Sequence, residues 1–139
     1  MTQLTLNKAF KHANVSTVHD QPNVVVVEAT ASYIPLERFM EIFNFISELK
    51  PVGGISKLIF DKRKLSVFHQ PSMEWYFVDW KEKMYDQGLR THRKILPRDD
   101  VFRQSVRIGR DKIAKAHPTR KFNLMDIQYC ESLEEALIR

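Results

Sequence analysis

The sequence predicts an α/β fold, with a mostly parallel mixed sheet of about five strands, an N-terminal antiparallel hairpin and helices that cover the sheet. Strand patterns and helix patterns alternate along the chain after residue 14. Val24–Val27 is a run of four β-branched residues, typical of a central strand with two buried faces. A length of 139 residues with 43% hydrophobic residues fits one domain. We therefore expect a single domain over 15–139, preceded by a short, loose lead-in over 1–14.

The first two strands should form the hairpin. Residues 15–19 alternate polar and apolar side chains, as an edge strand does, and residues 24–31 continue the valine run. Residues 20–23 contain Asp, Pro and Asn, which favour a tight turn. Two strands joined by so short a turn are expected to pair antiparallel.

Three amphipathic helices follow, each marked by apolar residues three or four positions apart. Pro35 opens the first helix, and Pro51 with Gly53-Gly54 ends it. The three apolar stripes are Leu36, Phe39, Met40, Phe43, Ile46 and Leu49; Met73, Tyr76, Phe77, Trp80 and Met84; and Phe102, Val106, Gly109, Ile113 and Ala116. Further strands are expected at 57–61, 92–96 and 122–129. Ser132 and Glu135 have the spacing of a capping box, which predicts a short final helix.

Cysteine usage and addressing signals exclude several classes of protein. A single cysteine, Cys130, rules out an internal disulfide and an all-cysteine zinc site. Met1 to Phe10 has no apolar core of signal-peptide length, and the longest aliphatic run, Val24–Val27, is far shorter than a membrane span. A lone thiol without such signals is typical of the cytoplasm, where we expect this protein.

Several segments share their order and character with a known family. They are the hairpin with Val24–Val27, the helix start Tyr33–Phe39, the strand Lys57–Arg63 with its Phe60-Asp61-Lys62-Arg63 end, Glu74–Trp80, and Cys130–Leu137. Over residues 15–139 this pattern resembles the STAS-like family, the fold of anti-sigma-factor antagonists, and looks closest to its divergent stand-alone branch.

The resemblance implies a non-enzymatic, regulatory interaction domain that binds a protein partner or itself, as a homodimer. In anti-sigma-factor antagonists, a serine in an Asp-Ser-Ser-Gly stretch is phosphorylated to break a partner complex. This chain lacks that stretch, and the corresponding connection offers Ser66 and Ser72. Asp61 closes a strand at the carboxyl edge, where parallel sheets bind ligands, and Arg63 or Lys62 could pair with it. Asp61, Arg63, Ser66 and Ser72 are therefore the candidate ligand or switch region, with a solvated turn acid as the alternative.

Catalysis, metal binding and cofactor binding have no motif in this sequence. None of the five histidines forms a pair with metal-ligand spacing, and the four glycines form no phosphate-binding loop. Ser66, Ser72, His69 and Asp61 are close in sequence but lack a nucleophile elbow, and Ser72 more simply caps a helix. We expect no catalytic residue, no metal and no cofactor.

Positive charge is concentrated in one segment. Residues 89–121 carry 11 basic and 3 acidic residues, whereas residues 1–50 carry 4 basic and 5 acidic ones. Arg103, Arg107 and Arg110 share one face of the third helix. A solvated basic face, an acidic protein partner and nucleic acid remain open as interpretations, in that order.

Two further features concern binding. Trp75 lies off the apolar stripe of its helix, so with the three arginines it is a candidate partner-binding residue. The chain is also rich in aromatic residues, which leaves a small-molecule or lipid carrier as an alternative function. Its pocket would lie between helix and sheet, lined by Phe39, Phe43, Phe45, Phe77 and Trp80, although one core can absorb all of them.

Overall fold

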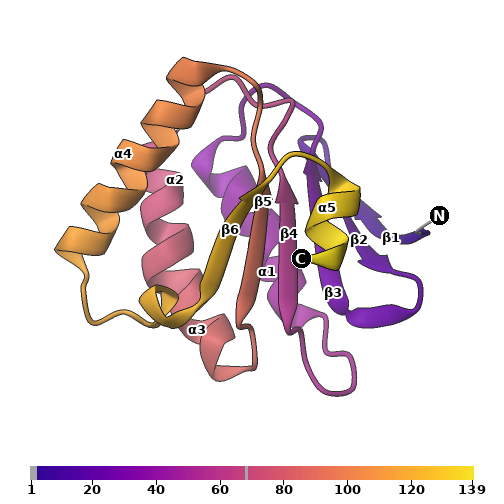
Figure 1. Ribbon diagram of the computed structural model, residues 1–139. Helices are drawn as coiled ribbons and strands as arrows, with labels where there is room; N and C mark the ends of the chain where they lie inside the picture. Colours follow the sequence, from indigo (N-terminus) through magenta and orange to yellow (C-terminus); the bar gives the residue numbers. More distant parts are fainter. Residues whose placement is uncertain (1–2, 68) are drawn as a thin grey trace.

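Val24–Val27 lies inside a six-stranded sheet that carries helices on both faces (Figure 1). The computed structural model describes residues 3–67 and 69–139. In chain order the elements are β1 (Leu4–Ala9), β2 (Ala13–Val18), β3 (Gln21–Ala29), α1 (Leu36–Glu48), β4 (Lys57–Asp61), α2 (Gln70–Trp75), a π-helical turn (Tyr76–Trp80), α3 (Lys81–Asp86), β5 (Thr91–Ile95), α4 (Asp100–Ala116), a 3₁₀ turn (Lys121–Leu124), β6 (Asp126–Cys130) and α5 (Leu133–Ile138).

The strands lie in the sheet in the same order as in the chain. β1, β2 and β3 are antiparallel neighbours, whereas β3, β4, β5 and β6 run parallel. This arrangement confirms the predicted α/β fold with an antiparallel N-terminal hairpin. Figure 1 shows α1 to α4 on one face of the sheet, here called the α4 face, and α5 on the other.

The valine run supplies both faces of the sheet. Val25 and Val27 belong to the large core on the α4 face, while Val24 and Val26 belong to a smaller core beneath α5. Side chains alternate along a strand, so a continuous apolar run can fill two cores at once. Each fully buried valine contributes about 1.5–3 kcal/mol of hydrophobic stabilisation.

The N-terminal region differs from the expected lead-in over 1–14. Leu4–Ala9 forms β1, an edge strand paired with β2, which gives the sheet six strands instead of about five. All six residues of β1 are exposed, so backbone pairing rather than an apolar pattern makes this strand. The sequence offered no periodicity there because the strand buries no face.

The segment before β6 also differs. Residues 122–129 were expected to be one strand, but Lys121–Leu124 is a 3₁₀ turn and β6 begins at Asp126. The Phe122 ring packs edge-to-face on Phe77, with centroids 5.2 Å apart. The Asn123 side-chain amide donates to the carbonyls of His117, Pro118 and Arg120 and so fastens the turn. This local bonding competes with strand pairing.

The second predicted helix contains a π-helical turn between α2 and α3. A π turn adds one residue to the helical repeat and occurs frequently at functional sites. The adjacent residues Tyr76 and Phe77 are both buried, and so are Trp80 and Lys81. The turn therefore directs more side chains toward the sheet than a regular helix of this length.

No helix in the described ranges, 3–67 and 69–139, is long and apolar enough to cross a membrane.

Candidate functional site: a buried lysine cluster

Three lysines are buried on the α4 face of the sheet. Lys62 directly follows β4, Lys81 begins α3, and Lys94 lies in β5; their exposed fractions are 1%, 0% and 0%. Lysine is almost never fully buried without a charged partner. We call Lys62, Lys81 and Lys94 the lysine cluster.

Strand alternation and helical periodicity bring these residues together. Lys62 and Phe60 point to the same side of the chain, as do Lys94 and His92, and Phe60 is the register partner of Lys94. Lys81 follows Phe77 by four residues and precedes Met84 by three, so it belongs to the inward stripe of its helix. The three ammonium groups thus reach the same layer from three elements.

Aromatic rings surround the amines. The Lys62 Nζ lies 4.9 Å from the Phe60 ring centroid, and the Lys81 Nζ lies 3.6 Å from that of Phe77. The Lys94 Nζ lies 4.8 Å from the Phe77 centroid and 5.5 Å from that of Tyr129. A desolvated cation over such a ring gains about 2 kcal/mol.

Hydrogen bonding divides the three lysines. The Lys81 Nζ lies 2.8 Å from His92 Nδ1, and His92 Nε2 lies 3.1 Å from the Tyr76 hydroxyl, so these three side chains are connected by two buried hydrogen bonds. The Lys62 Nζ reaches only the Met73 sulfur, at 3.7 Å. The Lys94 Nζ has no hydrogen-bond partner among the described residues.

No carboxylate of residues 3–67 or 69–139 forms an ion pair with these lysines. Burying an unpaired ammonium costs several kcal/mol, which exceeds the gain from a neighbouring ring. The charged form is therefore disfavoured in the ligand-free protein.

The pKa values follow from this imbalance. Burial, and secondarily the positive charge of Arg110, lowers the pKa of Lys62 to about 7. Burial also holds the pKa values of Lys81 and Lys94 well below 10.5, and neighbouring cations add to the effect. Burial lowers the pKa of His92 well below 6.5 and raises that of Tyr76 well above 10. Burial therefore favours the neutral forms of these amines, of the imidazole and of the phenol, while Lys62, with a pKa of about 7, exchanges its proton near neutral pH.

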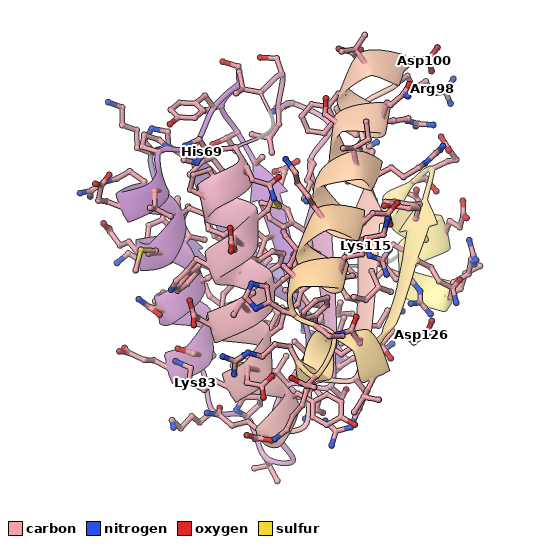
Figure 2. All side chains as sticks on the ribbon, turned by 90° about the vertical axis from the view of Figure 1, so that its left-hand side faces the viewer. His69, Lys83, Arg98, Asp100, Lys115 and Asp126 are labelled. Atoms are coloured by element: carbon pink, nitrogen blue, oxygen red, sulfur yellow. The ribbon has the colours of Figure 1, made fainter. Side chains whose placement is uncertain are left out.

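A cavity of about 280 Å³ adjoins the cluster between α4, the 3₁₀ turn and β6. Its wall includes Arg107, Arg110, Asp111, Phe122 and Tyr129, so two guanidinium groups outnumber one carboxylate. Tyr129 and the Phe122 neighbour Phe77 are the two rings that flank the Lys94 amine. Arg107 and Arg110 of α4 thus line a cavity whose Tyr129 wall also flanks the Lys94 amine. Figure 2 views α4 from outside, with Asp100 and Lys115 marking its two ends.

The predicted switch region contains a local ion pair. The Asp61 carboxylate, 6% exposed, accepts hydrogen bonds from the Arg63 backbone amide and guanidinium at 2.7–3.1 Å. The Lys62 side chain points to the opposite side of the strand and takes no part in the Asp61–Arg63 ion pair. Asp61 is therefore neither a free strand-end acid nor a fully solvated one.

Ser66 and Ser72 lie in different surroundings. Ser66 is exposed, with its hydroxyl 3.4 Å from the Ser32 carbonyl oxygen. Ser72 is buried inside the first turn of α2, where its hydroxyl lies 2.8 Å from His69 Nδ1. The predicted role of Ser72 as a helix cap is wrong, because His69 occupies the N-cap position. Asp61 bonds to Arg63, so no serine–histidine–aspartate arrangement forms from these residues.

The predicted partner-binding residues are spread over two elements. Trp75 is half-buried and packs edge-to-face on Phe39, with centroids 6.1 Å apart. Arg103 is held by the Pro97 carbonyl at 2.7 Å and by Glu131 at 3.3 Å. Arg107 is exposed, and it lines the 280 Å³ cavity together with Arg110. Two of the three arginines therefore belong to the wall above the lysine cluster.

The aromatic residues considered as a pocket lining fill the core instead. Phe39, Phe43, Phe77 and Trp80 are buried, and Phe39 and Phe43 stack with centroids 4.6 Å apart. The Trp80 indole donates to the Phe43 carbonyl oxygen at 2.8 Å. Phe45 is half-buried and packs on Phe10, with centroids 5.6 Å apart. The cavity described above lies outside this aromatic group.

Neither a search for metal-binding side chains in the described residues nor a comparison with known proteins assigns a function to this site. Within residues 3–67 and 69–139, no three His, Cys, Asp or Glu side chains are placed to hold a metal ion. No protein-family model matches the chain, and no curated protein or solved structure is significantly similar to it.

The lysine cluster itself was missed by sequence reasoning. Lys94 was counted with the basic segment, and Lys62 was considered only as a partner of Asp61. The available signal was positional: His92 and Lys94 alternate on one face of a strand expected inside the sheet, and Lys81 falls on an apolar stripe.

Proposed function

We propose that this protein binds a small anion, a phosphate or carboxylate compound, in the lysine cluster beneath α4. The single observation that carries the proposal is the burial of three lysines without a carboxylate among their contacts in the described chain. An anion in this position would supply the missing negative charge. Strong desolvation of this kind, with a named charge environment, is characteristic of functional sites.

Recognition combines buried and accessible cations. Arg107 and Arg110 line the cavity, and guanidinium groups bind phosphates and carboxylates in a bidentate manner. The amine of Lys94, which has no hydrogen-bond partner in the described part of the chain, then offers donors deeper inside the protein. Tyr129, 41% exposed, lines the cavity, and its ring centroid lies 5.5 Å from the Lys94 Nζ, so this side chain lies next to both the cavity and the amine.

Binding should be tested by thermal unfolding with inorganic phosphate, sulfate and malonate, each against sodium chloride at equal ionic strength. A ligand at about 100 times its Kd adds about 2.7 kcal/mol, which raises the Tm of a chain of this size by about 5–10 °C. Lys94→Met should lose most of this shift. Lys115→Met removes the same charge from an exposed position on α4 and should keep it.

Two results would contradict the proposal. One is a Tm that no anion raises above the sodium chloride control. The other is an equal loss in Lys94→Met and Lys115→Met, which would place the anions on the general basic surface instead of in the cluster.

A second candidate function is the interaction domain implied by the STAS-like resemblance, and the outer surface of α4 favours it. Val101 and Ile108 are 76% and 56% exposed and seven residues apart, and Lys112 and Lys115 continue the same stripe. An apolar stripe flanked by lysines suits an acidic amphipathic partner. Ile108→Glu should abolish retention of acidic proteins in a pull-down, whereas equal retention by wild type and variant would contradict this role.

A further inference from the structure

We infer that the anion bound at the lysine cluster also carries a ketone or aldehyde group, as a 2-oxo acid does, and that the Lys94 Nζ forms an imine with it. The inference rests on the proposed anion site and names the class of its ligand. It assigns covalent chemistry to one amine and charge recognition to the others.

Hydrogen bonding selects Lys94 among the three amines. The Lys81 Nζ is engaged with His92 Nδ1 at 2.8 Å, and the Lys62 Nζ is directed at the Met73 sulfur. The Lys94 Nζ has no such partner among the described residues, so its lone pair is available to attack a carbonyl carbon. It is also the amine flanked by Tyr129, which lines the cavity.

The protonation state suits a nucleophile. Burial, together with the positive charges of Lys62 and Arg110, lowers the pKa of Lys94 well below its usual value, which favours the unprotonated amine. Apolar surroundings and a neighbouring cation are the two means by which proteins activate lysine for imine formation. Phe60, Phe77 and Tyr129 provide the first, and Lys62 the second.

The step balances without any oxidant or reductant. The Lys94 nitrogen attacks the carbonyl carbon, and one nitrogen proton moves to the oxygen to give a carbinolamine. The Lys62 ammonium then donates a proton to the hydroxyl group, water leaves, and a positively charged iminium remains. A pKa of about 7 leaves Lys62 able to donate and regain this proton at neutral pH.

Charge complementarity fixes the ligand class. A 2-oxo acid carries its carboxylate on the carbon next to the carbonyl group, so both groups must be bound within one small site. The iminium and the guanidinium groups of Arg107 and Arg110, which outnumber the Asp111 carboxylate in the cavity wall, can then neutralise the carboxylate of the ligand. A volume of about 280 Å³ holds a compound of this size but not a large cofactor.

Reductive trapping tests the inference with pyruvate as the probe. The purified protein is incubated with pyruvate and then with borohydride, which reduces an imine to a stable secondary amine, and peptide mass spectrometry locates the adduct. We expect one adduct per chain, on Lys94, formed at least about tenfold faster than at exposed Lys115. Lys94→Arg replaces the amine by a guanidinium group, which cannot form an imine, and it should abolish this adduct.

The outcomes separate this inference from the proposed function. Lactate has the same carboxylate without the carbonyl group, so its effect on the Tm reports anion binding alone. If lactate raises the Tm and pyruvate leaves no adduct on Lys94, the imine is excluded and the anion site stands. If lactate gives no shift and pyruvate labels only surface lysines, both are excluded.

Discussion

Replacing Lys62 by methionine should make the free energy of unfolding less dependent on pH, because burial of the Lys62 amine causes part of that dependence in the wild type. Methionine keeps an unbranched side chain of similar length and removes the charge. The pKa of Lys62 is about 7 in the folded protein and 10.5 as the reference for the unfolded chain. Between these values the unfolded chain binds a proton at Lys62 that the folded chain does not, so the free energy of unfolding rises with pH.

The magnitude follows from that difference. One proton gives a slope of about 1.4 kcal/mol per pH unit, and the full interval between the two pKa values corresponds to about 5 kcal/mol. Methionine removes this penalty at neutral pH. The stability advantage of Lys62→Met over wild type should therefore be about 3 kcal/mol larger at pH 7.5 than at pH 10.

Urea unfolding followed by tryptophan fluorescence at several pH values measures this difference. Lys115→Met serves as the matched control, because it removes a lysine charge from an exposed position where folding changes its surroundings little. Parallel stability curves for wild type and Lys62→Met would refute the reasoning, since they would mean that burial does not disfavour the Lys62 ammonium.

Three further predictions follow from individual contacts. Tyr76→Phe leaves His92 Nε2 buried without its 3.1 Å hydrogen-bond partner and should lower the free energy of unfolding by about 1–3 kcal/mol, as measured by chemical denaturation. Tyr85→Phe, at a half-buried position, should lower it less. Equal effects of the two variants would contradict the buried Lys81–His92–Tyr76 hydrogen bonds. Ser132→Ala removes the cap that accepts from the Glu135 amide at 3.1 Å and should cost about 1 kcal/mol, against no measurable change for the exposed Ser66→Ala. The protein should take up protons when it binds phosphate near pH 7.5, because an anion favours the Lys62 ammonium. Titration calorimetry in buffers of different ionisation enthalpy detects this proton uptake. A binding enthalpy that is the same in every buffer would contradict it.

The sequence predicted the fold well wherever a face is buried. Val24–Val27 indicated a central strand because its side chains enter two cores, and the expected strand at 57–61 matches β4. Asp99 caps α4 by accepting from the Val101 amide at 2.9 Å. β1 was not predicted because it buries no side chain. The 3₁₀ turn was not predicted because it is stabilised by side-chain hydrogen bonds of Asn123, which leave no periodic pattern in the sequence.

The candidate site was harder to predict than the fold. Lys62, Lys81 and Lys94 come from three elements, and their convergence depends on the register of β4 and β5 and on the π-helical turn. A lysine in a basic segment is normally solvated, so composition placed Lys94 on the surface. The spacing of Arg107 and Arg110 placed them on one face of a helix. The structure adds that this face lines a cavity, to which both side chains contribute.

The protonation of the three buried amines tests the proposed anion site most directly, and NMR of the lysine side-chain nitrogens can follow it as a function of pH with and without phosphate. We expect three amines to titrate well below the remaining lysines, one of them near pH 7, and all three to shift upward when phosphate is added. Titration of every lysine near 10.5, unaffected by phosphate, would show that the amines are solvated and would contradict the anion site.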